Sequence, residues 1–360
     1  MRSAKQQLYD SFYYNFERWL TAVYENFRVL KRVRGQRCGP DFEQAFKTVI
    51  RPYWAQFGVR AKRRWAKERY LLNDSTDPRY IPNDLYITKI VPHFNPLPSV
   101  NTLTDKNLNS LLFPDVKRPE TAFKHMSGSY CREDFTPLTR DEAISLLEEG
   151  SRYVIKPARD TSEGMGVKLF TGPEEGAALA DSYADIDYLV QRAVVQHPAL
   201  AALNESSVNT IRLVTLLFRG KPYILSSILR VGGHGSTVDN IGSGGYQCNI
   251  GPDGTLLKLA FTRRSGKVEY VEENADGLRF EGYPIPSFEK AKEFVLTLAA
   301  RTPHLRLIAW DLSIDENGDV VLIEFNASMP GQNQRTCGPT FGDLTDDVLA
   351  EVFTKQKTRR

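Results

Sequence analysis

The chain has 360 residues, of which 41% are hydrophobic and 25% charged, and its formal net charge is +3. This length favours two or three domains, and this composition excludes a largely disordered chain. No apolar run approaches the roughly 20 residues of a membrane span. The first residues, MRSAKQQLYDSFYYNF, lack the continuous apolar core of a signal peptide, so we expect a cytoplasmic protein.

Charge is unevenly distributed along the chain. Residues 1–70 contain 16 Lys and Arg but six Asp and Glu, whereas the remainder contains 31 and 38. This asymmetry predicts an anionic partner for the N-terminal part, either an anionic glycan or a membrane surface. Nucleic acid is the weakest candidate, because no RNA- or DNA-binding motif is present. The alternative is a solvated basic face on helices that dock on the rest of the chain.

The N-terminal part is predicted to be helical. Apolar residues recur every three or four positions from Leu8 to Leu30, which is the period of an amphipathic helix. This stripe is expected to pack on its own domain, or to pair helices between subunits. A second helix is predicted over 42–57, kinked or split at Pro52, and a basic third helix over 60–72.

A boundary is predicted near residue 95. The stretches 73–84 and 91–98 are rich in Pro, Asn and Asp and predict loops, so residues 1–95 form a basic helical region. Beyond it, short β-branched and apolar segments predict strands, and two periodic segments predict helices. The strands are expected at 153–157, 187–195, 207–218, 222–231 and 320–325, and the helices at 141–150 and 288–300. This mixture predicts an α+β enzyme fold.

The four cysteines predict free thiols. Cys38, Cys131, Cys248 and Cys337 are far apart and form no CxxC pair. A disulfide framework or a zinc site is therefore not expected.

The stretch VVLIEFNASMPG, residues 320–331, carries two oxygen ligands inside an apolar run. Glu324 and Asn326 are two apart and face the same side of a strand, while Ile323 and Phe325 are expected to face a core. Upstream, IAWDLSIDENGDVV predicts a hairpin with ENGD as its turn, which brings Asp311 beside that pair. Such an oxygen set suits Mg²⁺. The alternative is solvent-facing carboxylates at strand ends.

A second stretch, YVIKPARDTSEGMGVKLF, offers groups for phosphate. Lys156 ends a predicted strand, a loop with Gly164 and Gly166 follows, and Val167 begins another strand. Glycines let backbone N–H groups approach an anion, and a lysine adds a point charge. The pattern is not a P-loop, and a GxG by itself is more often only a turn.

Together these stretches resemble the ATP-grasp superfamily, in which two α+β subdomains clasp ATP. The resemblance covers about residues 100–345 and adds two motifs, TDKNLNSLLFPDVKRPET and YLVQRAVVQHP. It implies an N-terminal subdomain at 96–190, a C-terminal subdomain at 191–345 and a basic tail at 346–360.

The resemblance also implies roles for individual residues. Lys106 and Lys156 would contact ATP phosphates beside the glycine-rich loop. Gln191 and Val194 would lie at the adenine. His197 would lie at the ribose, although a structural histidine is as plausible. The implied Mg²⁺ ligands are Asp311, Glu324 and Asn326.

The middle of the chain narrows the family. SVNTIRLVT resembles a strand of amino-acid ligases, with Asn209 and Arg212 as the matching pair. SSILRVGGHGSTVDNIGSGG resembles their next element, and its matching residues are Arg230, Asn240, Gly244 and Gly245. Both arginines would neutralise the transferred phosphoryl group. The chain is most similar to the sugar-transfer-associated ATP-grasp family, which is associated with bacterial surface-polysaccharide genes.

The implied function is an ATP- and Mg²⁺-dependent carboxylate–amine ligase. It would form an acyl phosphate and then an amide, joining a small-molecule or glycan carboxylate to an amine. Phosphoryl transfer needs positioning and charge neutralisation rather than a dedicated nucleophile. Two alternatives stay open: an ATP-grasp kinase that phosphorylates a sugar or another alcohol, and a non-catalytic ATP-binding scaffold.

Overall fold

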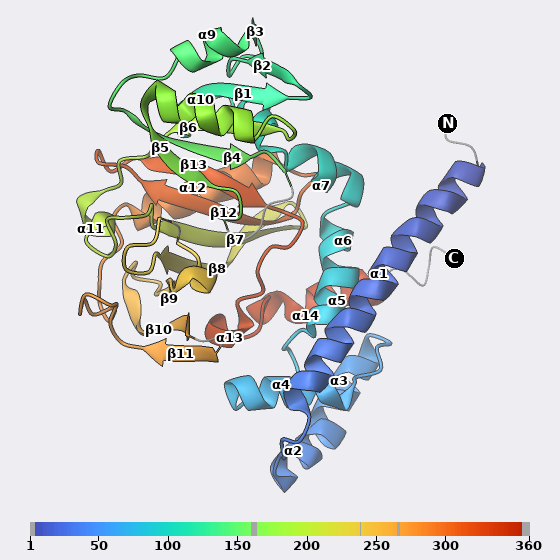
Figure 1. Cartoon of the computed structure of the whole chain (residues 1–360). Coiled ribbons are helices and arrows are strands. Elements are labelled where there is room, and N and C mark those ends of the chain that lie inside the picture. Colours follow the sequence, from blue (N-terminus) through green and yellow to red (C-terminus); the bar gives the residue numbers. More distant parts are fainter. Residues whose placement is uncertain (1–3, 160–163, 238, 265–266, 355–360) are drawn as a thin grey trace. The chain divides into compact units, whose positions relative to one another are not determined.

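The computed structural model describes residues 4–159, 164–237, 239–264 and 267–354. It divides into two compact units (Figure 1). The first unit combines Met1–Pro96 with Met329–Arg360, and the second unit is Leu97–Ser328. The subdomain limits at residues 95, 190 and 345 remain sequence-based predictions.

The first unit is helical, as the sequence predicts. Its N-terminal elements are α1 (Ala4–Val33), α2 (Pro40–Ala45), η1 (Phe46–Ile50), α3 (Arg51–Gln56), α4 (Arg63–Asn73), α5 (Asn83–Leu85), η2 (Tyr86–Ile90) and α6 (Val91–Phe94). Its C-terminal elements are α13 (Gln334–Cys337), η5 (Gly342–Leu344), α14 (Thr345–Leu349) and η6 (Ala350–Thr354). Among the described residues, no helix has the length and apolar character needed to cross a membrane.

Prolines shape these helices in two ways. The helix predicted over 42–57 forms as the continuous run α2, η1 and α3, so it is not split at Pro52. The wide π-turn η1 comes just before this residue, which has no N–H to donate. The prediction of a loop at 91–98 is wrong, since α6 and the start of α7 (Leu97–Leu103) are helical there. Pro92, like Pro52, follows directly on a π-turn, here η2. Pro98 lies in the first turn of α7, where a missing N–H costs nothing.

The two chain segments of the first unit share one core. Phe42 and Ile81 are fully buried, and Trp54 is 2% exposed. The C-terminal segment joins them through hydrogen bonds: the Ile81 N–H donates to Gln334 Oε1 at 2.7 Å, and the Tyr86 hydroxyl donates to the Pro330 carbonyl at 2.7 Å.

The second unit contains two antiparallel sheets. The six-stranded sheet has the order β3-β2-β1-β6-β4-β5. Its strands are β1 (Thr121–Met126), β2 (Ser129–Cys131), β3 (Pro137–Leu138), β4 (Arg152–Pro157), β5 (Lys168–Thr171) and β6 (Tyr188–Arg192), and its helices are α9 (Arg140–Ser145) and α10 (Gly172–Ser182). Phe123, Tyr153 and Phe170 belong to its core.

The seven-stranded sheet has the order β11-β10-β9-β8-β7-β12-β13. Its strands are β7 (Thr210–Phe218), β8 (Lys221–Val231), β9 (Tyr246–Ile250), β10 (Leu256–Arg264), β11 (Lys267–Val271), β12 (Leu307–Ile314) and β13 (Val320–Asn326). Helix α12 (Phe288–Arg301) contacts β7, β8, β12 and β13. Short helices complete the unit: η3 (Lys106–Leu108), α8 (Asn109–Leu112), α11 (Pro198–Ala201) and η4 (Ile241–Ser243).

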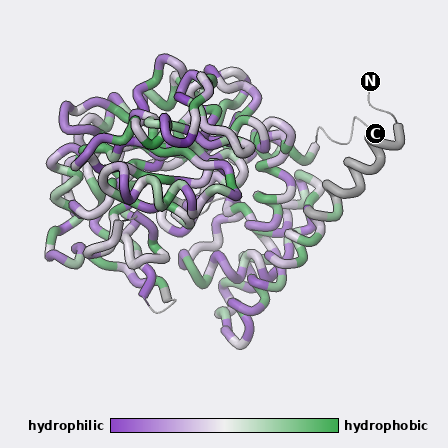
Figure 2. The backbone as a smooth tube through the Cα atoms, turned by 45° about the horizontal axis from the view of Figure 1, so that its top comes forward, coloured by the Kyte–Doolittle hydropathy of each residue, from purple (hydrophilic) through white to green (hydrophobic). Residues whose placement is uncertain are grey.

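Each predicted strand and helix of this unit is present, but α9 ends at Ser145 rather than at residue 150 and β6 ends at Arg192 rather than at residue 195. The predicted hairpin is formed by β12 and β13, whose turn closes with the Gly318 N–H donating to the Asp315 carbonyl at 2.9 Å. Apolar side chains from α12 and from one face of the seven-stranded sheet form one large core. Hydrophobic segments of the backbone run through the interior of the second unit (Figure 2). The other face of β7, β12 and β13 therefore remains for polar groups.

Candidate active site

Three neighbouring strands align charged side chains in one row. Asp311 on β12 pairs directly with Arg212 on β7 and with Glu324 on β13. Arg212 binds Asp311 through both guanidinium arms, with Nε–Oδ1 at 2.7 Å and Nη2–Oδ2 at 2.6 Å. Trp310 and Leu312 point to the opposite side, into the core. Strand alternation thus aims the row away from α12.

Asp311, in the centre of this row, is a buried carboxylate whose charge is stabilised by arginines. Asp311 is 1% exposed. Burial alone would raise the pKa of Asp311, but the charges of Arg212 and then Arg230 hold it below its usual range. The carboxylate therefore stays ionised near neutral pH despite its low-dielectric surroundings.

Arg230 extends the row onto β8 and brings a residue that the sequence analysis missed. Its Nη1 lies 3.4 Å from Asp311 Oδ2, and its Nη2 lies 3.1 Å from Asp239 Oδ1. Asp239 also accepts a hydrogen bond from the Thr210 hydroxyl. Burial raises the pKa of Asp239, and Arg230 opposes this rise. Its only signal in the sequence is its position beside Asn240 in the TVDN stretch.

The predicted oxygen trio does come together. Asn326 Nδ2 lies 3.4 Å from both Asp311 Oδ2 and Glu324 Oε1. This set consists of two carboxylates and one amide. Among the described residues, no group of three His, Cys, Asp or Glu side chains is arranged to hold a metal ion. An amide can present its oxygen after a half-turn, so the set fits a hard cation such as Mg²⁺.

The predicted alternation of β13 holds only in part. Phe325 faces the core as expected, but Leu322 rather than Ile323 joins it there. The pairing of β12 with β13 shifts between Asp311 and Leu312, so Ile323 is the extra residue of a β-bulge. Such a bulge re-aims the backbone locally. The Ile323 carbonyl lies 3.5 Å from Lys156 Nζ.

Two lysines from outside the seven-stranded sheet meet the same carboxylate edge. Lys106 Nζ lies 3.9 Å from Glu324 Oε2. Lys156, at the end of β4, is 8% exposed. Burial lowers the pKa of Lys156 to about 8, with Glu324 opposing the shift and Lys106 adding to it. The site thus combines two ammonium groups, two guanidinium groups, two carboxylates and one amide.

Comparison with known proteins gives this arrangement a family. Residues 88–335 match the model of the sugar-transfer associated ATP-grasp family. The chain belongs to this ATP-grasp family. No curated protein matches the chain.

Comparison with solved structures finds two synthetases among the matches. D-alanyl-alanine synthetase A from Vibrio cholerae has 17% identity and a TM-score of 0.43, and the match covers 70% of this chain and 65% of that one. For D-cycloserine synthetase the values are 14% and 0.42, with 71% and 73% covered. The chain thus spans less than two thirds of the first of these proteins.

The structure describes part of the glycine-rich loop of the second unit. Gly164 and Gly166 have φ angles of +74° and +71°, a region that side chains rarely adopt. A Cβ atom on Gly166 would lie 2.9 Å from Pro157 Cγ, so only glycine fits there. The preceding residues 160–163 lie outside the described residues.

The residues assigned to adenine and ribose lie at the end of β6 and in the segment after it. Gln191 is buried, and its Nε2 donates to the Pro119 carbonyl at 3.1 Å and to Thr121 Oγ1 at 3.2 Å. Val194 is half-buried in the connection that leads from β6 towards β7. His197 caps α11, since its Nδ1 accepts from the Ala199 N–H at 3.1 Å. This hydrogen bond gives His197 a structural role, which was the alternative to a contact with the ribose.

Asn240 and its glycines build a tight turn beside Asp239. Asn240 Oδ1 accepts from the Gly242 N–H at 2.9 Å, which starts η4, and Gly244 has a φ of +83°. A Cβ atom on Gly245 would lie 2.7 Å from the carbonyl oxygens of Asn240 and Val231. The two glycines that match the amino-acid ligase pattern, Gly244 and Gly245, are thus required by the backbone of this turn.

Asn209, which with Arg212 forms the pair that matches the amino-acid ligase strand, fixes the backbone of the second unit through hydrogen bonds. It is fully buried. Its Nδ2 donates to the carbonyls of Leu200 at 2.7 Å and Asn204 at 2.8 Å, and its Oδ1 accepts from the Gly232 N–H at 3.1 Å. Asn209→Ala strands several of these groups and is expected to lower the free energy of unfolding by about 2–3 kcal/mol.

Urea denaturation measures this loss. Asn317→Ala, in the exposed turn of the β12–β13 hairpin, is the matched control and should change stability by less than about 0.5 kcal/mol. Equal stabilities of the two variants would contradict the locking role of Asn209.

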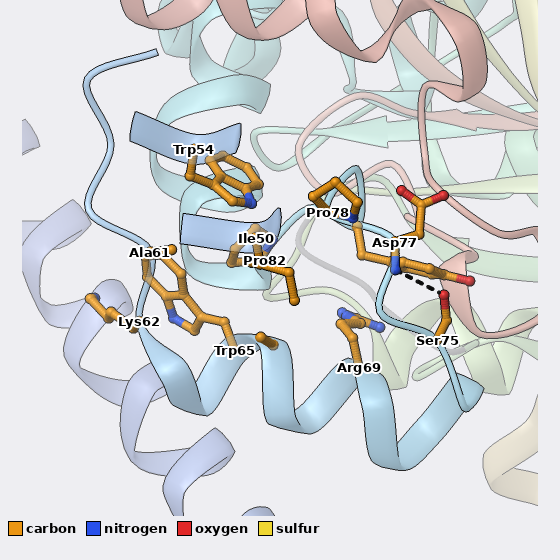
Figure 3. Close-up of a pocket in the computed structure, with 12 residues that line it drawn as sticks. Ile50, Trp54, Ala61, Lys62, Trp65, Arg69, Ser75, Asp77, Pro78 and Pro82 are labelled. Carbon is orange, nitrogen blue, oxygen red and sulfur yellow. Dashed lines mark hydrogen bonds between the residues drawn. The ribbon is translucent and has the colours of Figure 1, made fainter. Parts of the chain in front are cut away.

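A separate pocket lies in the first unit (Figure 3). Its walls include Trp54, Trp65 and Arg69. Among the described residues, neither Arg69 Nε nor Trp65 Nε1 has a hydrogen-bond acceptor. The enclosed part measures about 20 Å³, which suits one water-sized group rather than a nucleotide or a sugar ring. The ATP-binding residues inferred above do not line it.

Proposed function

We propose that the chain is an ATP- and Mg²⁺-dependent carboxylate–amine ligase that forms ADP. The observation that carries the proposal is that carboxylates and cations meet at one edge of the seven-stranded sheet. Glu324 lies 3.9 Å from Lys106, and Asn326 lies 3.4 Å from both Glu324 and Asp311. A site built to hold a polyphosphate and a divalent cation needs both kinds of group close together.

The oxygen trio would hold the metal. Asp311 and Glu324 supply charge, and Asn326 supplies a neutral oxygen once its amide turns. A Mg²⁺ ion bound there contributes positive charge next to the phosphate oxygens. Arg212, which binds Asp311 in the structure, fixes the orientation of that carboxylate.

The nucleotide would lie along β4 and the connection after β6. Lys106 and Lys156 would contact its phosphates, with the N–H groups around Gly164 and Gly166 closing over them. Gln191 and Val194, with His197 beyond them, would border the nucleoside. The Gln191 Nε2 already donates to the Pro119 carbonyl and to Thr121 Oγ1, so Gln191 would contact the base through its side-chain oxygen.

The chemistry would proceed in two steps. The acceptor carboxylate attacks the γ-phosphorus, the bond from that phosphorus to the β–γ bridging oxygen breaks, and ADP leaves. An amine then attacks the acyl phosphate, the carbon–oxygen bond breaks, and phosphate and an amide form as the nitrogen loses a proton. Arg212 and Arg230 would stabilise the charge on the transferred group, and Asn240 would shape the acceptor side.

The acceptor would be a carboxylate carried by a small molecule or a glycan, such as a uronic acid. The description of the family as sugar-transfer associated supports a role in surface-polysaccharide or related metabolite modification. The 16 basic residues among the first 70 suit an acidic glycan as well as an acidic lipid surface.

The experiment is an ATP-consumption assay with separated pools of carboxylic acids, amines and neutral sugars. A ligase releases ADP and free phosphate only when an acid and an amine are both present. A kinase would consume ATP with a sugar alone and leave a phosphomonoester. An ATP-binding scaffold would bind Mg-ATP without turnover on any pool.

The lowered pKa of Lys156 predicts a pH dependence of ATP binding. The free protein loses the Lys156 proton as pH rises through about 8, whereas the polyphosphate requires the ammonium form. Affinity should therefore be constant below pH 8 and fall by up to about tenfold per pH unit above it. Calorimetric titrations between pH 7 and 9.5 measure this slope. Lys156→Arg, which stays charged, should flatten it, and a wild-type profile without a slope would contradict the assignment.

A further inference from the structure

Helix α1 turns an apolar face outward. Seven large apolar side chains are between 47% and 66% exposed, and we call this set the aromatic face: Phe16, Trp19, Leu20, Val23, Tyr24, Phe27 and Leu30. At 100° per residue they fall within an arc of about 140°. The expectation that this stripe packs on its own domain is therefore wrong for these residues.

The opposite side of α1 explains why. Glu25 accepts a hydrogen bond from Asn83 at 2.6 Å, Asn26 donates to Asp84 at 2.8 Å, and Arg32 pairs with Glu68. Buried Val29 and Val33 lie on the same side. Polar contacts to α4 and α5 thus fix the rotation of α1, and the aromatic face cannot turn inward without breaking them.

Basic residues adjoin the aromatic face. From Arg28 to Arg37 the sequence RVLKRVRGQR contains five basic residues and no acidic one. Lys31, Arg34 and Arg37 are exposed. An amphipathic helix with aromatic side chains on one face and cations at its border is the pattern of a helix that lies in the interface of an anionic membrane.

We propose that α1 binds the surface of an anionic lipid membrane through its aromatic face and the basic segment Arg28–Arg37. Trp19 and Tyr24 each carry a polar tip on an apolar ring, and the lipid headgroup region hydrates such tips while it accepts the rings. A helix pair between two copies of this chain would use a narrower apolar seam than this arc. The inference is independent of the catalytic proposal, since it rests on α1 alone.

The test is co-sedimentation of the full-length protein with vesicles of phosphatidylcholine, with and without phosphatidylglycerol. We expect binding to the anionic vesicles that weakens as salt is raised. Trp19→Ser/Phe27→Ser should weaken it by about tenfold or more. Lys31→Gln/Arg34→Gln should reduce the preference for anionic lipid. The matched control is Leu257→Ser/Leu259→Ser on β10, where the two side chains are 48% and 47% exposed, and it should bind as wild type does.

Circular dichroism checks that each variant folds. Equal binding to neutral and anionic vesicles, absence of binding, or unchanged binding by a folded Trp19→Ser/Phe27→Ser variant would overturn the proposal. A dimer in sedimentation velocity that this variant abolishes, without vesicle binding by wild type, would assign the face to a second copy instead.

Discussion

Glu324→Gln is expected to lower the rate of ATP-dependent ligation by about a thousandfold, equal to about 4 kcal/mol in the barrier. Glu324 connects the lysine and amide groups of the site, because its carboxylate lies close to both Lys106 and Asn326. Glutamine keeps the shape but removes the charge that would hold the metal and balance the lysine. The loss should appear in turnover and in the Mg²⁺ dependence of ATP binding.

Stability should change little in this variant. The Glu324 side chain is 31% exposed, and its carboxylate lies 3.9 Å from Lys106 and 3.4 Å from Asn326, so no tight buried pair is broken. Glu316→Gln, exposed in the turn of the same hairpin, is the matched control and should retain full activity. A Glu324→Gln enzyme with activity close to that of Glu316→Gln would remove Glu324 from the metal site.

Arg212→Met is expected to destabilise the protein by about 3–5 kcal/mol, because it leaves the Asp311 carboxylate buried with its main counter-charge gone. Among the described residues, Arg230 would be the remaining cation at Asp311, with its Nη1 3.4 Å away, and the Asn326 amide lies equally far from this carboxylate. Denaturant unfolding measures the loss. The double variant Arg212→Met/Asp311→Leu should recover part of the lost stability, because the buried Asp311 carboxylate is then absent.

A surface pair provides the control for this prediction. Arg301 binds Asp115 through two contacts of 3.0 and 2.7 Å, but the two side chains are 41% and 65% exposed. Solvent screens such pairs, so Arg301→Met should cost less than about 1 kcal/mol. If Arg212→Met were no more costly than Arg301→Met, the buried row would not stabilise the fold.

Local periodicity accounts for the side chains that the sequence places together. The alternation around Glu324 and Asn326 and the turn at ENGD predict that these two side chains lie beside Asp311, and in the structure the three are neighbours. The lysine at the end of β4 also reaches this edge. These features depend on strand period and turn chemistry, which a short stretch of sequence specifies.

Other features depend on pairing between distant segments. The bulge at Ile323 arises from the register of β13 against β12, and Asp239 enters the site only because β8 carries Arg230 past β7. Asn209 has a structural use because three separate backbone segments meet around it. The outward rotation of α1 is set by its contacts with Asp84 and Glu68, which lie far along the chain.

The central claim is that a carboxylate attacks the γ-phosphate of ATP at this site. We would measure it by ³¹P NMR of the phosphate released from Mg-ATP with ¹⁸O-labelled carboxylic acids and an amine pool, with Glu324→Gln as the inactive control. The account predicts phosphate that carries one ¹⁸O from the acid, seen as an isotope shift, and no such signal from the variant. Released phosphate without the label, or a phosphomonoester in its place, would contradict it.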